Sequence, residues 1–276
     1  MASFPPVRAI IRGLEILRTV SQEGPISAGA IARRTDLPQP TVIRILETLI
    51  QSGYLYRDPD SVTYGVTART LALSIGYNSS SRLVQIAQPL IEELRAEIGW
   101  PSNLAIFEQD AMVIAYTNRA AKGLQMPGRL GARIPLLATG VGVIFLANQD
   151  PGERDAILAR LRRSGERWDQ EPSLWSGLEE RLTEARRRGF AFADEGYLDA
   201  VYQSRIWAVA VPIGFEGGTV AALSSLVLRT TGPQKRILTQ ILPALRRTAS
   251  AIEDRLMADA GSVDAGSGAD SRRSGP

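Results

Sequence analysis

The chain has 276 residues and a formal net charge of +3, 44% of its residues are hydrophobic, and it contains neither cysteine nor histidine. This length predicts two domains, and the missing residue types exclude disulfides, thiolate catalysis, serine–histidine triads and the usual zinc sites. The sequence has no run of about 20 apolar residues, and residues 1–6 lack the apolar region of a signal peptide. We therefore expect a soluble, cytoplasmic protein without a cofactor, a metal ion or a membrane contact.

Three amphipathic helices are predicted in the N-terminal part of the chain. Apolar residues recur at helical spacing over residues 8–22, and Gly24 and Pro25 end this first helix. Ser27 is placed to cap a second helix that ends at Thr35, and residues 36–38 (DLP) form a tight turn. The third helix covers residues 41–52 and has one apolar and one polar face.

Two β-prone runs, residues 54–57 and 62–66, follow the third helix directly. The turn sequence DPDS at residues 58–61 joins them, so they predict a β-hairpin. Three helices followed by a hairpin are typical of a winged helix-turn-helix. We therefore predict a DNA-binding domain over residues 7–67.

Residues 68–98 predict a helical linker, interrupted near residues 78–81 and near Pro89, whose ring disfavours an unbroken helix. Beyond the linker we predict an α+β domain with an antiparallel sheet over residues 99–257. Its expected strands are residues 103–108, 111–118, 190–194, 206–212 and 219–228, and its expected helices are residues 139–147, 151–163, 173–189 and 233–257. Residues 258–276 hold almost no large apolar side chain and predict a disordered tail.

The third helix carries most of the candidate DNA contacts. A recognition helix buries one face and presents short polar and basic side chains to base edges in the major groove. The candidates in or next to its first turn are Gln39, Thr41, Val42 and Arg44. Ser27 at the start of the second helix and Arg57 on the hairpin are candidates for contacts with backbone phosphates.

These features resemble the IclR family of bacterial transcriptional regulators over about residues 7–257. In the first domain the resemblance rests on residues 12–17 (RGLEIL), 31–38 (IARRTDLP), 41–49 (TVIRILETL) and 53–55 (GYL). In the second it rests on residues 135–142 (PLLATGVG), 194–196 (DEG) and 208–213 (AVAVPI). The resemblance implies a GAF-like effector domain, homodimers or homotetramers on palindromic operator DNA, and control by a small, often carboxylated metabolite. RNA polymerase is a further candidate partner.

The same resemblance implies where the effector binds. The positions carried over to this chain are Gly140, Val141, Asp194, Ile206, Ala208 and Ser224. The chain departs from the family at residues 137–143, where it reads LATGVGV and many members read HATALGK. A frequent cysteine position corresponds to Ala208. These departures concern the identity of the effector rather than the fold.

Within the family, residues 135–139 (PLLAT), 100–101 (WP) and 110–113 (DAMV) look most like activators of 3-hydroxyphenylpropionate catabolism. That similarity implies an aromatic acid effector and catabolic target genes. Such an acid needs an apolar slot for its ring and hydrogen-bond donors for its carboxylate. The candidate slot residues are Leu137, Ile206 and Trp207. The candidate donors are N–H groups near Gly140, the side chain of Ser224, and the guanidinium groups of Arg133 and Arg205.

Two other classes of protein stay open. An enzyme built on the second domain would use Ser224, Ser225 or carboxylates, but without histidine it lacks an obvious general base. Asp194 and Glu195 are expected side by side on a strand, where neighbouring side chains diverge and form no carboxylate pair. The other class is a winged-helix scaffold that binds proteins and not DNA. The glycines at 140 and 142 equally suit plain close packing of a helix.

Overall fold

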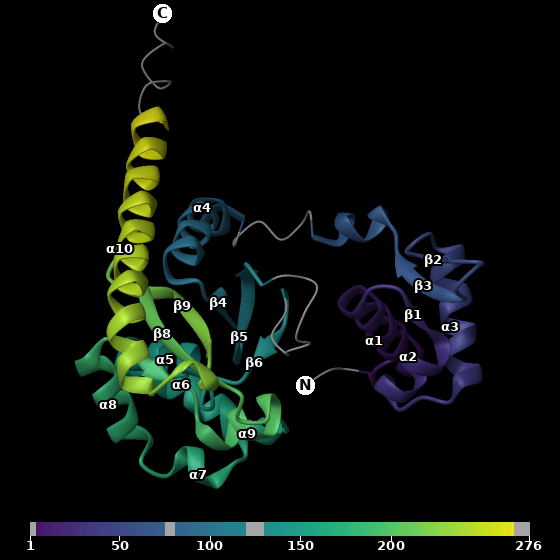
Figure 1. Cartoon of the computed structure of the whole chain (residues 1–276), viewed down its shortest axis with the longest axis horizontal. Coiled ribbons are helices and arrows are strands. Elements are labelled where there is room, and N and C mark those ends of the chain that lie inside the picture. Colours follow the sequence, from purple (N-terminus) through teal and green to yellow (C-terminus); the bar gives the residue numbers. More distant parts are fainter. Residues whose placement is uncertain (1–3, 75–80, 120–129, 268–276) are drawn as a thin grey trace, which may run out of the picture. The chain divides into compact units, whose positions relative to one another are not determined.

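The computed structural model describes residues 4–74, 81–119 and 130–267, and the chain divides into two compact units, residues 1–78 and 79–276. The N-terminal unit contains α1 (Arg8–Glu23), α2 (Ala28–Thr35) and α3 (Gln39–Gln51). Its strands are β1 (Ile26–Ser27), β2 (Leu55–Arg57) and β3 (Thr63–Val66), paired antiparallel in the order β1-β3-β2. This arrangement, shown in Figure 1, confirms the winged helix-turn-helix.

The core of this unit follows from the apolar faces of the three helices. Ile16 of α1, Ile31 of α2 and Leu46 of α3 are fully buried in one cluster, together with Leu55 from the wing. The turn between α2 and α3 depends on Asp36, which adopts the left-handed conformation (φ 51°) and donates its N–H to the carbonyl of Ala32. Because a short polar side chain tolerates this conformation, the turn needs no glycine.

The predicted linker is divided between the two units. The 3-10 helix η1 (Ala68–Ser74) belongs to the N-terminal unit, where Arg69 lies over the ring of Tyr54 at 5.4 Å. The helix α4 (Ser81–Ile98) belongs to the C-terminal unit and runs through Pro89 without a break, so the interruption expected there was wrong. Leu90 and Ile91, which follow the proline, are buried in that unit's core, and this packing outweighs the lost hydrogen bond. The interruption expected at residues 78–81 lies mostly outside the described residues.

A six-stranded antiparallel sheet forms the centre of the C-terminal unit and confirms the α+β class. Its strands, in the spatial order β6-β5-β4-β9-β8-β7, are paired antiparallel throughout. In chain order they are β4 (Ser102–Glu108), β5 (Ala111–Thr117), β6 (Arg133–Ile134), β7 (Ala191–Phe192), β8 (Ile206–Phe215) and β9 (Gly218–Leu228).

Helices cover both faces of this sheet (Figure 1). On one face α4 and α10 (Gln234–Ser267) bury Leu104, Leu223 and their neighbours. The other face packs against α5 (Gly140–Ala147), with α6 (Pro151–Leu161), α7 (Pro172–Trp175), α8 (Leu178–Arg188) and α9 (Glu195–Tyr202) around it. Because side chains alternate along a strand, Ala105 and Ala222 join this second core. The 3-10 helices η2 (Arg167–Asp169) and η3 (Arg229–Thr231) complete the unit.

Three predicted elements of the C-terminal unit differ in the structure. The single helix expected over residues 173–189 is split into α7 and α8, because Gly177 adopts the left-handed conformation (φ 65°) between them. The strand expected over residues 190–194 ends at Phe192, and Asp194 instead caps α9. Helix α10 continues to Ser267, so residues 258–267 are helical where the sequence predicts a disordered tail. Residues 268–276 lie outside the described residues.

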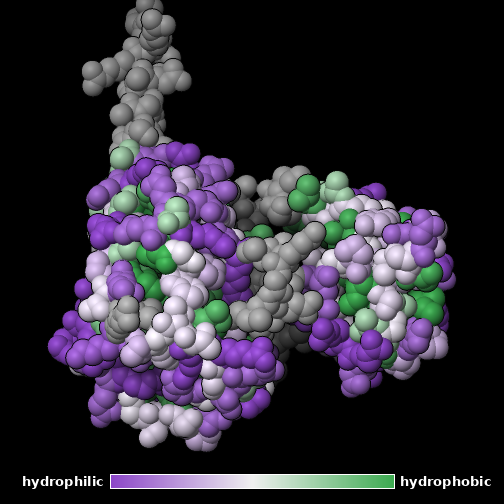
Figure 2. Space-filling view, viewed as in Figure 1, coloured by the Kyte–Doolittle hydropathy of each residue, from purple (hydrophilic) through white to green (hydrophobic). Residues whose placement is uncertain are grey.

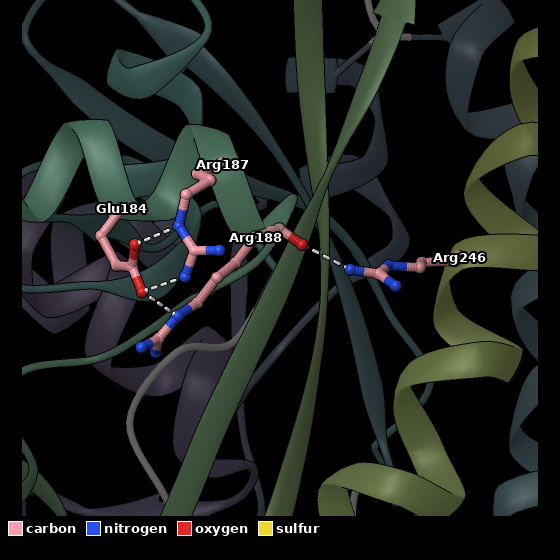
Figure 3. Close-up of polar contacts among 4 residues, drawn as sticks. All are labelled: Glu184, Arg187, Arg188 and Arg246. Carbon is pink, nitrogen blue, oxygen red and sulfur yellow. Dashed lines mark hydrogen bonds and ion pairs between the residues drawn. The ribbon is translucent and has the colours of Figure 1, made fainter.

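The side chain of Arg246 connects α10 to the C-terminal end of α8 (Figure 3). Arg246 of α10 donates to the carbonyl of Arg188, an acceptor that the helix end leaves free. On α8, Glu184 forms ion pairs with Arg187 and Arg188. The hydrogen bond from Arg187 lowers the pKa of the Glu184 carboxyl to about 2, so this carboxylate stays ionised down to strongly acidic pH.

Helix α5 approaches its neighbours so closely that two of its positions have no room for a side chain. A Cβ on Gly140 would lie 2.7 Å from the carbonyl oxygen of Ala191, and a Cβ on Gly142 would lie 2.2 Å from that of Leu136. Both distances are far below van der Waals contact. The two glycines therefore fix how α5 sits against β7 and against the turn that precedes it.

We predict that Gly142→Ala destabilises the protein by about 1–3 kcal/mol, because the new methyl group forces backbone atoms apart. The matched control is Gly152→Ala in α6, where no atom lies within 4 Å of the added Cβ. That substitution should leave stability unchanged or raise it by up to about 1 kcal/mol. Thermal and urea denaturation measure both changes, and equal stabilities of the two variants would contradict the argument.

Candidate functional site

The exposed face of α3 presents the polar residues expected of a recognition helix. Gln39 and Arg44 are exposed and Thr41 is half-buried, while Leu46 on the opposite face is fully buried in the core. Pro40 lies in the first turn, where its missing N–H removes no helical hydrogen bond. The polar side of α3 is therefore accessible to solvent over the first two turns of the helix.

Val42 is the one α3 candidate that the structure removes. Its side chain is fully buried in the cluster that holds the three helices together, so it cannot touch a base. The physical reason is its spacing of four residues from Leu46, which places both side chains on the same helix face. Ile43, the next residue, is 36% exposed and lies on the accessible side.

The two candidates for phosphate contacts lie on other elements of the same unit, and both are exposed. Ser27 caps α2, where its Oγ accepts a hydrogen bond of 3.4 Å from the N–H of Ala30. Its hydroxyl hydrogen remains available for a second partner. Arg57 is on β2 of the wing, directly opposite Tyr64 of β3.

A pocket opens in the C-terminal unit between the sheet, the start of α5 and helix α9. Its empty volume, which includes space open to solvent, is about 420 Å³. Four of the predicted effector residues line it: Gly140, Val141, Ala208 and Ser224. The remaining lining residues are Asn103, Ile114, Ile134, Thr139, Ala193, Tyr197, Leu198, Tyr202, Val209, Ala210 and Leu226.

The start of α5 gives this pocket a polar end. Thr139 caps the helix: its Oγ1 accepts a hydrogen bond of 3.2 Å from the N–H of Gly142 and donates one of 2.7 Å to the carbonyl of Pro135. The N–H groups of Gly140 and Val141 belong to the first turn of α5, where no preceding helical carbonyl can accept from them, and both residues line the pocket. Such a helix start favours an anionic group.

Asp194 and Ile206 do not line the pocket. Asp194 instead positions one of its walls, because its carboxylate accepts a hydrogen bond of 3.0 Å from the N–H of Tyr197 and so caps α9. Its backbone N–H donates to the carbonyl of Ala138 at 2.9 Å, which ties α9 to the turn before α5. Ile206 is buried in the core under the pocket.

The other candidates for the slot and for the carboxylate lie elsewhere. Leu137 is fully buried in the core, and Trp207 packs on the opposite face of the sheet with α4 and α10, so neither forms the slot. Arg133 is half-exposed and forms an ion pair with Asp110. Arg205 is exposed. Neither arginine is among the residues that line the pocket.

Sequence reasoning missed the tyrosines of α9 and the polar residue of β4. Burial raises the pKa of Tyr197, and a hydrogen bond with Tyr202 adds to that rise, so the phenol stays neutral. The positive charge of Arg119 acts on Tyr197 in the opposite direction. Trp168 packs edge-on against the Tyr197 ring, with the centroids 5.1 Å apart. The residues 195–202 carried no expected element, which is why α9 escaped attention.

Asn103 of β4 is the other missed residue. It lies opposite Ser224 of β9, and Ser224 lies opposite Ala210 of β8, so the three form one row across the sheet. All three line the pocket. The local sequence carried no signal for it, because the neighbouring Ser102 is polar as well and lies on the opposite face of the strand.

Within the described ranges, no helix combines the length and hydrophobicity that crossing a membrane requires. The described part of the chain also holds no group of three or more acidic side chains arranged to bind a metal ion.

Comparison with known families matches both units. The family model of the IclR helix-turn-helix domain matches residues 9–59, and that of the bacterial transcriptional regulator IclR C-terminal matches residues 75–254. The transcriptional repressor IclR of Escherichia coli (strain K12) is 26% identical over 195 residues, which are 68% of this chain and 70% of the relative. The Pca regulon regulatory protein of Pseudomonas putida is 27% identical over 248 residues, 86% of this chain and 81% of that one.

Solved structures share the fold. An IclR homolog from Microbacterium hydrocarbonoxydans, crystallised as a complex with 4-hydroxybenzoate, superposes with a TM-score of 0.61 at 24% sequence identity. The match covers 91% of this chain and 99% of that one.

Proposed function

The chain belongs to the IclR family of bacterial transcriptional regulators, and on that basis we propose that an aromatic acid in the α5 pocket controls its binding to operator DNA. That it is a DNA-binding regulator and not an enzyme follows from the family. To the family assignment the proposal adds three points: the residues that contact DNA, the chemical class of the effector, and the oligomeric state of the protein. The observation that carries it is the pocket itself, with helix N–H donors at one end and an apolar lining around them.

For the DNA contacts, we propose that Gln39, Thr41 and Arg44 reach base edges or neighbouring phosphates from α3. Their exposure opposite the buried face of the helix supports this. Arginine suits the edge of guanine and glutamine that of adenine, because each makes two hydrogen bonds there. Ser27 and Arg57 are proposed to contact backbone phosphates, which set the register of the protein on the duplex.

For the effector, we propose a carboxylate held by the N–H groups of Gly140 and Val141 and by the hydroxyl of Ser224. Apolar residues such as Ile114, Ile134 and Leu226 suit the ring of an aromatic acid. Support also comes from the names of similar proteins, which include a Pca regulon regulator and a 4-hydroxybenzoate complex.

Within the family, we propose the subgroup of activators of 3-hydroxyphenylpropionate catabolism, with catabolic genes as targets and RNA polymerase as a further partner. We also propose a cytoplasmic location, because the operator DNA of a bacterium is there.

We further propose that the protein acts as a homodimer or homotetramer. One head reads few base pairs, and a two-fold pair of heads matches a palindromic operator. An exposed apolar stripe at the start of α1 supports pairing, since Val7, which precedes the helix, and Ile10, Ile11 and Leu14 within it are each more than half exposed. Hydrophobic side chains at the surface of the N-terminal unit are visible in Figure 2.

We predict that Arg44→Ala weakens binding to the duplex upstream of its own gene by about 1–3 kcal/mol if Arg44 reads a base. The matched control is Arg18→Ala, which removes another exposed arginine, from α1. Fluorescence anisotropy at several salt concentrations measures both affinities. Affinity should fall steeply with salt for the wild type. A flat salt dependence and equal effects of the two variants would favour the scaffold that binds only proteins.

We predict that aromatic acids raise the melting temperature and alter tryptophan fluorescence, because Trp168 packs on Tyr197 of the pocket wall. Ser224→Ala should weaken acid binding by about 1.5–3 kcal/mol, since hydrogen bonds to charged groups are the stronger ones. The control is Ser225→Ala: its Oγ donates to the carbonyl of Pro101 and faces the other side of the sheet. Binding of no acid, or turnover of a bound acid that Ser224→Ala abolishes, would count against the proposal.

A further inference from the structure

A second hollow of the C-terminal unit, here called the arginine hollow, is formed by residues of α5, α6 and α8. Its empty volume, which includes space open to solvent, is about 660 Å³. The lining residues are Ala147, Arg154, Leu182, Thr183, Arg186 and Arg187. Ala147 is the last residue of α5, whereas Gly140, the first residue, lines the α5 pocket. The arginine hollow is therefore a separate site at the other end of that helix.

The arginines of this hollow come from two helices. On α8, Thr183 precedes Arg186 and Arg187 by three and four residues, a spacing that brings side chains together on one face of a helix. Arg154 reaches the same hollow from near the start of α6. Every ionisable side chain in the described lining is thus a guanidinium, and no carboxylate is among these residues.

Nearby carboxylates neutralise these arginines only in part. Glu184 forms ion pairs with both Arg187 and Arg188, so one carboxylate serves two guanidinium groups and a positive charge is left over (Figure 3). Arg186 is exposed and forms no ion pair or hydrogen bond with any residue that the structure describes. The hydroxyl of Thr183 likewise has no partner within the described ranges. The α8 side of the hollow therefore offers donors and positive charge.

Arg154 also has donors that no acceptor uses. Its carboxylate neighbours lie 3.7 Å from Nε, on Asp155, and 3.6 Å from Nη2, on Glu179. Both distances are too long for a hydrogen bond. The Nε atom is buried without a partner among the described residues, although the side chain as a whole is 23% exposed. Because an unpaired buried donor costs stability, an acceptor that lets Arg154 turn toward it stabilises this side chain.

Capping of helix ends does not explain these arginines. Basic side chains near the C-terminus of a helix often donate to its last carbonyl groups. At the end of α8 it is Arg246 that donates to the carbonyl of Arg188, and neither Arg186 nor Arg187 donates to a carbonyl group in the described part of the chain. Arg154 lies near the start of its helix, where the helix dipole disfavours a cation.

We propose that the arginine hollow binds the phosphate or diphosphate group of a small molecule, held by Arg154 of α6 and by Arg186 and Arg187 of α8. Each guanidinium group can donate two hydrogen bonds to phosphate oxygens, and the hydroxyl of Thr183 adds another donor. An anion between the two helices also removes the repulsion between the arginines. This site lies beyond the proposed function and does not depend on it.

The lining indicates a small molecule rather than a nucleic acid. A nucleic acid backbone needs a basic groove that follows it over several nucleotides. Here the basic lining is confined to one hollow, and the carboxylates of Asp155 and Glu179 lie beside Arg154. Ala147 and Leu182 are the only apolar residues of the described lining, which contains no aromatic side chain. Recognition is therefore concentrated on the anionic group.

The test titrates inorganic pyrophosphate and inorganic phosphate into the full chain by isothermal titration calorimetry, at constant ionic strength. The wild type should bind pyrophosphate saturably. Arg186→Ala and Arg154→Ala should each weaken that binding about tenfold or more, because each removes hydrogen bonds to a charged group. Arg186→Lys keeps the charge and loses the planar pair of donors, so its affinity should lie between those of the wild type and Arg186→Ala.

Arg163→Ala is the matched control. Arg163 is an exposed arginine that directly follows α6 and does not line the arginine hollow. Its removal should leave the affinity for pyrophosphate unchanged. Without ligand, Arg186→Ala should melt at the wild-type temperature, because an exposed side chain without partners contributes little to stability. Arg186→Ala thus decides the test even if Arg154→Ala fails to fold.

Three outcomes would overturn the site. The first is a wild type that binds neither anion, and the second is anion binding that Arg186→Ala leaves unchanged, since the anion then binds elsewhere. The third comes from titrating a DNA duplex of unrelated sequence: a loss of duplex affinity in Arg186→Ala, with no binding of either anion by the wild type, would assign the hollow to nucleic acid. Saturable binding of either anion that Arg186→Ala weakens supports the site, whether or not an aromatic acid binds in the α5 pocket.

Discussion

The close contact between α5 and the backbone around it is the constraint on which the pocket depends. All eight residues of α5 are buried, and the helix lies against β7 and against the turn at Leu136 only because positions 140 and 142 lack side chains. A helix set further out would bring its first N–H groups away from the sheet. Gly140 and Gly142 therefore allow α5 to pack closely, as the sequence suggested. The same close packing also places the electropositive start of α5 beside the pocket.

The sheet serves two purposes because its side chains alternate between faces. Leu104 and Leu223 fill the core under α4 and α10, whereas Asn103 and Ser224, one residue along each strand, face the pocket. Polar residues in the middle of a sheet usually cost stability unless they are paired. Here the apolar side of the same strands supplies enough buried surface to keep the sheet in place. A ligand site can then include polar groups whose partners arrive only with the ligand.

Local sequence patterns predicted most helices and strands. They did not predict the features that depend on contacts between residues far apart in the chain. Helical spacing located α3, and the order of helices and hairpin gave the winged fold. The same spacing could have shown that Val42 shares the buried face with Leu46. In contrast, nothing local marks Asn103 as a pocket residue, because its place follows from the pairing of β4 with β9 far along the chain. Pro89 and Asp194 were misread for a similar reason. Packing against α10 carries α4 through the proline, and the strand that was expected to contain Asp194 stops two residues earlier.

The pocket lies beside two helices that Asp194 connects to each other. Asp194 caps α9 with its carboxylate, and its backbone N–H donates to Ala138 in the turn that leads into α5. The start of α5 and the tyrosines of α9 are thus connected through one residue outside the pocket. A ligand shifts a conformational equilibrium only by the difference between its affinities for the two states. A ligand that contacts both helices gains such a difference whenever their spacing changes, whereas one that contacts only the sheet does not. The proposed regulation therefore depends on ligand contacts at both α5 and α9, and we expect Asp194 to set the spacing of these helices without touching the ligand.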